Sequence, residues 1–223
     1  MTTEEKPKFT TFVFDLDGTL LNTLPDLVEL TNHVLTEAGY PTRTQEEILS
    51  FVGNGVRSLM SQAVPLDADP YKVERVTNRW KSMYESYDHL TCVYEGMEET
   101  LQKMAAMGVR MAVLSNKFDA ASKTVIRKHL PGLFELVYGE CEKIPRKPNP
   151  LGLETVIQEL GVQKKDVVFV GDSVNDIDVA HNAGVCSIGV SWGYQDVSRL
   201  VAHDAGYIIH EPYELLAFVR HGR

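Results

Sequence analysis

Two aspartates separated by one residue follow a short apolar run near the start of the chain. Asp15 and Asp17 stand in FVFDLDGTLLNT, residues 12–23, directly after a strand-like stretch. Burying an unpaired carboxylate is energetically expensive, and two carboxylates this close repel each other. The pair therefore indicates a bound cation, a capped loop or a catalytic task, because nothing adjacent in the sequence offers a counter-ion.

Polar residues follow two further apolar runs in the same way. Ser115 and Asn116 come after MAVL, Asp172 and Asp176 come after VVFVG, and Lys147 lies in the loop PRKPNP. Taken singly, each could be a helix cap, a turn residue or surface charge. Ligands of an open parallel sheet bind at the carboxyl ends of its strands. The recurrence of polar groups at strand ends therefore favours one common active site.

The order of the expected elements predicts how these residues are brought together. Phe9–Phe14 is typical of a first strand, and a helical pattern then extends to about residue 90. After that point strands and helices alternate, which predicts a parallel sheet with right-handed crossovers. We expect an α/β fold, namely a doubly wound, Rossmann-like parallel sheet formed by residues 1–21 and 91–223. Residues 22–90 would form a helical cap domain inserted after the first strand.

Composition excludes several classes of function. The chain has 223 residues and a formal net charge of −9, which argues against a nucleic-acid binder that works through a basic surface. Its three cysteines are widely spaced, so neither a disulfide framework nor a C-x-x-C metal site is expected. No run of apolar residues suits a membrane span or a signal peptide. These features favour a cytoplasmic protein, and they leave open whether it is a monomer or a homodimer.

Four motifs occur in the order found in the haloacid dehalogenase-like superfamily. They are DLDGT at 15–19, VLSNK at 113–117, RKPNP at 146–150 and GDSVND at 171–176. The helical insertion after the first motif lies where that superfamily carries its cap. Within the superfamily, the segments DLDGTLLNTLPDL and FVGNGVRSLM resemble the phosphoglycolate phosphatase group in particular.

The resemblance implies a role for each acid and for the lysine. Asp15 would be the nucleophile that forms an aspartyl-phosphate, and Asp17 would protonate the leaving alkoxide and then deprotonate the hydrolytic water. Asp15, Asp17 (through its backbone carbonyl) and Asp172 would hold Mg²⁺, which suits a site of hard oxygen ligands. Asp176 would lie behind these ligands or orient Lys147.

The phosphate group would be held by the remaining core motifs. Ser115 and the backbone of Asn116 would bind its oxygens, and Lys147 would neutralise the charge that spreads over them during transfer. The acid at Asp17 points to phosphate-ester chemistry, because dehalogenases and phosphonatases of this superfamily lack an acid at that position.

The segment VGNG, residues 52–55, is the candidate for substrate recognition by the cap. Its glycine-rich loop can present backbone N–H groups to an anion, so we single out Gly53, Asn54, Gly55 and Arg57 as substrate contacts. A simple turn between two helices explains the same residues equally well, and Arg57 could face solvent.

The sequence thus predicts a Mg²⁺-dependent phosphatase whose partner is a small phosphorylated metabolite, with 2-phosphoglycolate first. The alternatives are a pyrophosphatase or nucleotidase of the same superfamily and a phosphomutase of the β-phosphoglucomutase type. A non-catalytic binding protein on this fold is disfavoured, because an idle relative would be expected to lose at least one of Asp15, Asp17, Lys147 and Asp172.

Overall fold

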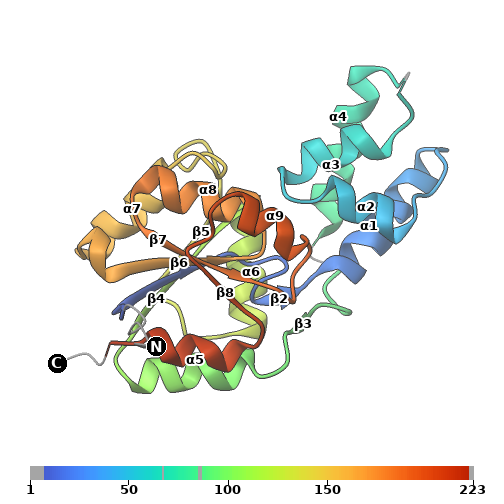
Figure 1. Cartoon of the computed structure of the whole chain (residues 1–223). Helices are drawn as coiled ribbons and strands as arrows, with labels where there is room; N and C mark the ends of the chain where they lie inside the picture. Colours follow the sequence, from blue (N-terminus) through green and yellow to red (C-terminus); the bar gives the residue numbers. More distant parts are fainter. Residues whose placement is uncertain (1–7, 67, 85–86, 221–223) are drawn as a thin grey trace.

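A six-stranded parallel sheet forms the centre of the larger part of the molecule (Figure 1). The computed structural model describes residues 8–66, 68–84 and 87–220. The strand order is β5-β4-β1-β6-β7-β8, and every neighbouring pair is parallel. The bounds of these strands are β1 Thr11–Phe14, β4 Arg110–Phe118, β5 Leu136–Glu140, β6 Val167–Gly171, β7 Cys186–Val190 and β8 Tyr207–Ile209. The order reverses beside β1, so its carboxyl end opens at the crevice where ligands of such sheets bind.

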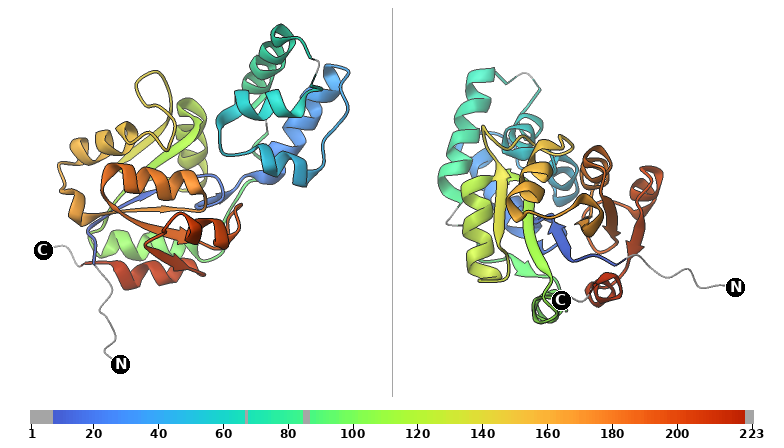
Figure 2. Two further views of the ribbon diagram at one scale, coloured as in Figure 1. Left: turned by 45° about the horizontal axis from the view of Figure 1, so that its top comes forward. Right: turned by 90° about the vertical axis from the view of Figure 1, so that its left-hand side faces the viewer.

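Helices cover both faces of this sheet, which confirms the predicted doubly wound fold (Figures 1 and 2). The alternation of side chains along β1 places Phe12 and Phe14 in one apolar cluster and Val13 in the other. The first cluster contains α5 (Met97–Ala106), α6 (Asp119–His129) and a 3₁₀ helix (Pro212–Phe218). The second contains α7 (Leu151–Leu160) and α8 (Val174–Ala183), and α9 (Val197–Ala202) contacts α8.

The strand β4 is longer than the sequence pattern indicates. The apolar run predicts a strand that ends at Ser115, but β4 continues to Phe118, and its register with β5 shifts after Leu114. Asn116 and Lys117 therefore belong to the strand, where both are buried. A strand is predicted from its apolar side chains, so a buried stretch of polar residues at its end is not recognised as part of it.

A second, helical lobe lies beyond one edge of the sheet (Figures 1 and 2). Its helices are α1 (Leu24–Glu37), α2 (Gln45–Phe51), α3 (Gly55–Ala63) and α4 (Pro70–Met83). They share an apolar cluster of their own, in which Leu30, Met60 and Trp80 are almost fully buried. This cluster is largely separate from those on the two faces of the sheet. No helix in the described ranges is both long enough and apolar enough to cross a membrane.

Two chain segments connect the lobes side by side. The short strands β2 (Leu21–Asn22) and β3 (Cys92–Val93) pair in antiparallel fashion where the chain leaves the sheet and returns to it. Just beyond this ribbon, the buried carboxylate of Asp26 accepts hydrogen bonds from the backbone N–H groups of Leu90 and Thr91, at 3.1 and 2.6 Å. The Thr91 hydroxyl donates a further bond, also at 2.6 Å. The outgoing and returning segments are therefore fixed to each other.

Candidate active site

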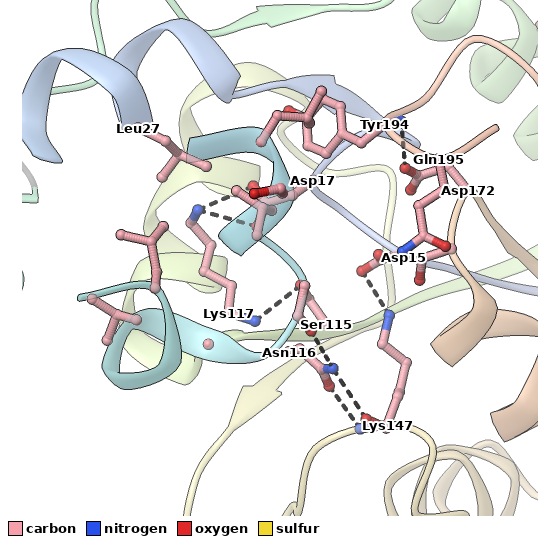
Figure 3. A pocket seen from close by; sticks show the side chains of 18 of the residues that line it. Asp15, Asp17, Leu27, Ser115, Asn116, Lys117, Lys147, Asp172, Tyr194 and Gln195 are labelled. Carbon is pink, nitrogen blue, oxygen red and sulfur yellow. Dashed lines mark hydrogen bonds and ion pairs between the residues drawn. The ribbon is translucent and has the colours of Figure 1, made fainter. Parts of the chain in front are cut away.

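A cavity of about 390 Å³ lies between the carboxyl edge of the sheet and the helical lobe. Six of the residues singled out in the core motifs line it, and Figure 3 shows them converging from β1, β4, β6 and the loop before α7. These six are Asp15, Asp17, Ser115, Asn116, Lys147 and Asp172. The helical lobe contributes a wall whose apolar side chains are those of Leu27, Leu49, Val52, Val56, Leu59 and Trp80, together with the polar Glu46 and Ser50. The strand-end rule thus places the core residues together as expected.

The buried ammonium group of Lys147 joins two acids. Its Nζ lies 2.8 Å from Asp15 Oδ1 and 2.6 Å from Asp176 Oδ1. Burial, together with the charge of Asp176, raises the pKa of Asp15 to about 7, although Lys147 opposes this shift. Burial alone would lower the pKa of Lys147, but the charges of Asp15 and Asp176 outweigh it and raise that pKa. Lys147 therefore remains charged where it faces Asp15.

The carboxylate of Asp172 is held from two sides. Its oxygens accept hydrogen bonds from the Thr19 hydroxyl at 2.8 Å and from the Tyr194 backbone N–H at 2.7 Å. Gly18 and Gly193 make room for it, because a Cβ atom on either would lie within 2.4 Å of an Asp172 atom. Burial, followed by the charges of Asp176 and Asp15, raises the pKa of Asp172 well above its usual range.

The side chain of Asp17 has a separate set of partners. Lys117 Nζ lies 3.0 and 3.2 Å from its two oxygens, and the Thr23 hydroxyl donates to Oδ1 at 2.6 Å. The Lys117 side chain is only 5 % exposed. Burial would lower the pKa of Lys117, but the charges of Asp17 and Tyr84 and the hydrogen bonds to these two residues together outweigh it and raise that pKa. Asp17 therefore has a protein counter-ion, and this cation is a lysine 100 residues away in the sequence rather than an adjacent residue.

Ser115 and Asn116 occupy the end of β4 beside the lysines. The Asn116 amide accepts a bond from the Lys147 backbone N–H at 2.6 Å and donates to the Lys147 carbonyl at 3.1 Å. It also donates to the Gly53 carbonyl at 2.9 Å, which links the sheet edge to the helical lobe. Ser115 Oγ accepts a bond from the Lys117 backbone N–H at 3.2 Å. This network fixes the loop that carries Lys147.

The four candidate residues of the helical lobe divide into two pairs. Gly53 and Gly55 line the cavity, whereas Asn54 and Arg57 are exposed and are not among its lining residues. The rotation of α3 explains this division, because it turns Val56 and Leu59 toward the cavity and Arg57 toward solvent. The structure therefore brings two of the four to the site.

The acids at the base of the cavity fit a divalent cation. Asp15, Asp172 and Asp176 each offer a carboxylate oxygen, and these oxygens lie within 4.8 Å of one another. Asp15 Oδ1 is buried, and among the described residues it has only the Lys147 ion pair and no well-directed hydrogen bond. Burial, followed by repulsion from the charge of Asp176, raises the pKa of Asp15 and of Asp172, and a bound cation would oppose both effects. Oxygen-only ligands of this kind suit a hard metal ion.

Comparison with known proteins identifies the family to which this geometry belongs. A family model described as "Haloacid dehalogenase-like hydrolase" matches residues 12–190. The chain belongs to the haloacid dehalogenase-like hydrolases.

Relatives of known name lie within the same family. The chain is 34 % identical to a phosphoglycolate phosphatase of Chromobacterium violaceum, covering 91 % of this chain and 94 % of that one. It is 31 % identical to a phosphoglycolate phosphatase of Vibrio parahaemolyticus, covering 92 % and 94 %. A solved structure from Haemophilus somnus, described as a predicted phosphoglycolate phosphatase, superimposes with a TM-score of 0.87 at 27 % identity, covering 93 % and 96 %. The predicted family and the prediction of a phosphatase are confirmed.

Several residues of this hydrolase site were not singled out from the sequence. Thr19, Thr23, Lys117 and Tyr194 all contact its acids. Thr19 and Lys117 stand inside the motifs DLDGT and VLSNK, so their position beside the acids was an available signal. Tyr194 belongs to the loop after β7, and no motif marks it.

Proposed function

We propose that the chain is a Mg²⁺-dependent phosphatase that hydrolyses a small phosphomonoester through an aspartyl-phosphate on Asp15. The observation that carries this proposal is the geometry of Asp15, which faces the buried Lys147 at 2.8 Å and clusters with Asp172 at the base of the cavity. The names of the relatives make 2-phosphoglycolate the first candidate substrate.

In the first step, a carboxylate oxygen of Asp15 attacks the phosphorus atom as the bond to the leaving oxygen breaks. Asp17 supplies the proton that the leaving oxygen takes up. In the second step, Asp17 takes a proton from water, whose oxygen attacks the phosphorus and releases Asp15 as a carboxylate. The two acids thus have different tasks, which agrees with their different partners.

Positive charge must offset the repulsion between Asp15 and the phosphate dianion. Two unit charges about 4 Å apart repel by roughly 4 kcal/mol at an effective dielectric constant near 20. Bound Mg²⁺ would screen this repulsion and orient the reacting oxygens. Asp15, the backbone carbonyl of Asp17 and Asp172 would hold the ion, while Asp176 keeps Lys147 in place at 2.6 Å.

The remaining groups would bind the phosphate and close the site. Ser115 and the Asn116 backbone would hold phosphate oxygens, and Lys147 would stabilise the charge of the transition state. We propose that residues 22–90 act as the cap over a core of residues 1–21 and 91–223. Gly53 and Gly55 would contact the leaving group there, whereas Asn54 and Arg57 remain sequence-based predictions.

A panel of phosphate-release assays tests this function. The panel contains 2-phosphoglycolate, pyrophosphate, nucleoside monophosphates and sugar phosphates, each with Mg²⁺ and with a chelator. We expect phosphate release from at least one monoester, lost on chelation and highest for 2-phosphoglycolate. Release from pyrophosphate or nucleotides alone would reassign the substrate. Conversion of a sugar 1-phosphate to its 6-phosphate without release would instead show a mutase, and no turnover of any compound would refute the proposal.

A further inference from the structure

Two buried lysines divide the acids of the site into two groups. Lys147 pairs with Asp15 and Asp176, and these two acids belong to the carboxylate cluster that fits a metal ion. Asp17 is outside that cluster and pairs with Lys117. Figure 3 shows two separate ion pairs, one in which Lys117 reaches Asp17 and one in which Lys147 reaches Asp15. Asp15 and Asp17 are two residues apart in the sequence, yet each has its own cation.

The contacts of Lys117 fix the orientation of the Asp17 carboxylate. One ammonium group reaches both oxygens, at 3.0 and 3.2 Å, and the Thr23 hydroxyl adds a bond to Oδ1 at 2.6 Å. Because Lys117 spans both oxygens, one of its bonds remains when the other oxygen carries a proton. Lys147 cannot replace it, since its own ammonium is engaged by Asp15 and Asp176.

The helical lobe covers Lys117 from the opposite side. The ring of Tyr84, directly after α4, lies 4.6 Å from Lys117 Nζ in a cation–π arrangement. Tyr84 also packs edge-on against Phe118, the residue after Lys117 in the chain, at 5.6 Å between ring centroids. The position of the ammonium group is therefore defined by the sheet and by the helical lobe together.

We propose that Lys117, which lies beneath the ring of Tyr84, is a positioning residue. It holds the Asp17 carboxylate in the place from which a proton can reach the leaving oxygen. This inference rests on the proposed function, in which Asp17 carries that proton. Lys117 donates hydrogen bonds to Asp17 and transfers no proton itself. The proton moves from an Asp17 oxygen to the leaving oxygen as its bond to phosphorus breaks, and Asp17 is left as a carboxylate beside Lys117.

Substrates that differ in their need for a proton test this role. Nitrophenolate leaves without protonation, whereas the alkoxides of 2-phosphoglycolate and propyl phosphate need it. First-turnover rates at saturating substrate are measured by stopped flow for 4-nitrophenyl phosphate and by rapid quench for the alkyl phosphates. For Lys117→Met we expect a loss of roughly 30-fold or more with the alkyl phosphates, and at most the ~10²–10⁴-fold that a positioned acid contributes. The loss with 4-nitrophenyl phosphate should stay below about three-fold.

The chain offers a matched control outside the cavity. Lys123 pairs with Asp119 at 2.6 Å and lies 5.7 Å from the ring centroid of Tyr138, so Lys123→Met removes the same kinds of contact at an exposed position. Both alkyl and aryl rates should be unchanged in Lys123→Met. Lys117→Arg, which keeps the charge, should recover part of the alkyl rate, and it serves in place of Lys117→Met if that variant does not fold.

A double-mutant cycle gives a second readout. In an Asp17→Asn background, Lys117→Met should cause no further loss of the alkyl rate, because its effect passes through Asp17.

Equal losses for alkyl and aryl substrates would overturn the proposal and leave Lys117 as structural only. A raised KM with unchanged kcat would also overturn it, in favour of substrate binding. A wild type that hydrolyses only the aryl phosphate refutes the role of Asp17 as an acid, whereas one that hydrolyses neither class refutes the phosphatase itself.

Discussion

A divalent cation would balance the charges of the ionised side chains at the base of the cavity. Four carboxylates, those of Asp15, Asp17, Asp172 and Asp176, face the two ammonium groups of Lys117 and Lys147. If all six groups are ionised, two negative charges remain. A divalent ion would cancel this excess without any further cationic side chain. Burial raises the pKa of Asp15 and of Asp172, and the negative charge of their neighbours raises both further.

These raised pKa values predict how the stability of the metal-free protein depends on pH. In the unfolded chain an aspartate has a pKa of about 3.9, whereas the pKa of Asp15 in the folded protein is about 7. Folding therefore favours the protonated form of Asp15. The resulting contribution to the stability of the folded protein is complete below about pH 4 and is lost as the pH rises through about 7. We expect the melting temperature of the chelated protein to fall between pH 5 and pH 8.

Added Mg²⁺ should reverse that trend. The ionised carboxylates that repel one another at pH 8 are the ligands that we propose for the ion, so Mg²⁺ should raise the melting temperature more at pH 8 than at pH 5. Calorimetry at both pH values measures the difference, and Asp172→Asn should reduce it. An Mg²⁺ effect that is the same at both pH values would contradict the assignment of these acids as ligands.

At the scale of elements, the loop after β7 supports Asp172 through a close contact. A Cβ atom on Gly193 would lie 2.1 Å from Asp172 Cβ, so Gly193→Ala must displace the aspartate or the loop. We expect the Mg²⁺ concentration for half-maximal activity to rise by about 10-fold or more, as for other changes behind metal ligands. The measurement is a Mg²⁺ titration of the phosphatase rate.

Gly161→Ala is the control for that titration. Gly161 has a φ of +64°, but its added Cβ would meet nothing within 4 Å. The Gly161→Ala substitution should lower the free energy of unfolding by about 1 kcal/mol through backbone strain and leave the Mg²⁺ requirement unchanged. If both variants shift the Mg²⁺ titration equally, the contact between Gly193 and Asp172 is not its cause.

The connection between the two lobes depends on the buried Asp26. Asp26→Ala leaves the N–H groups of Leu90 and Thr91 without their acceptor, so we expect the free energy of unfolding to fall by about 3 kcal/mol. The exposed Glu29, which pairs with His89 at 3.1 Å, is the matched control, and Glu29→Ala should cost less than about 1 kcal/mol. Urea unfolding of both variants measures these values, and equal losses would contradict the anchoring role.

At the scale of the whole molecule, the sequence predicts which side chains meet at the carboxyl ends of the strands. Asp15, Ser115, Lys147 and Asp172 come together because the carboxyl ends of parallel strands meet at one edge. The same rule places Lys117, which stands in VLSNK beside Ser115, near Asp17, but no pattern in the sequence specifies that these two side chains pair.

The contribution of the helical lobe was also only partly predictable. The residue types in VGNG and at Arg57 suggested substrate contacts. Whether a side chain points to the cavity or to solvent, however, depends on how α3 is rotated against the sheet. The structure turns Val56 to the cavity and Arg57 to solvent. Tyr84 reaches Lys117 only through the packing of the two lobes, which no spacing along the chain specifies.

The nucleophilic role of Asp15 has the most direct test in a trapped intermediate. An Asp17→Asn variant should accept phosphate from 4-nitrophenyl phosphate, which needs no acid, but it should hydrolyse the product slowly because it lacks the base. After acid quench, borohydride reduction converts a phosphorylated aspartate to homoserine, which peptide mass spectrometry locates. We predict homoserine at position 15 in nearly stoichiometric amount. Stoichiometric release of nitrophenolate with an unmodified Asp15 would contradict the mechanism.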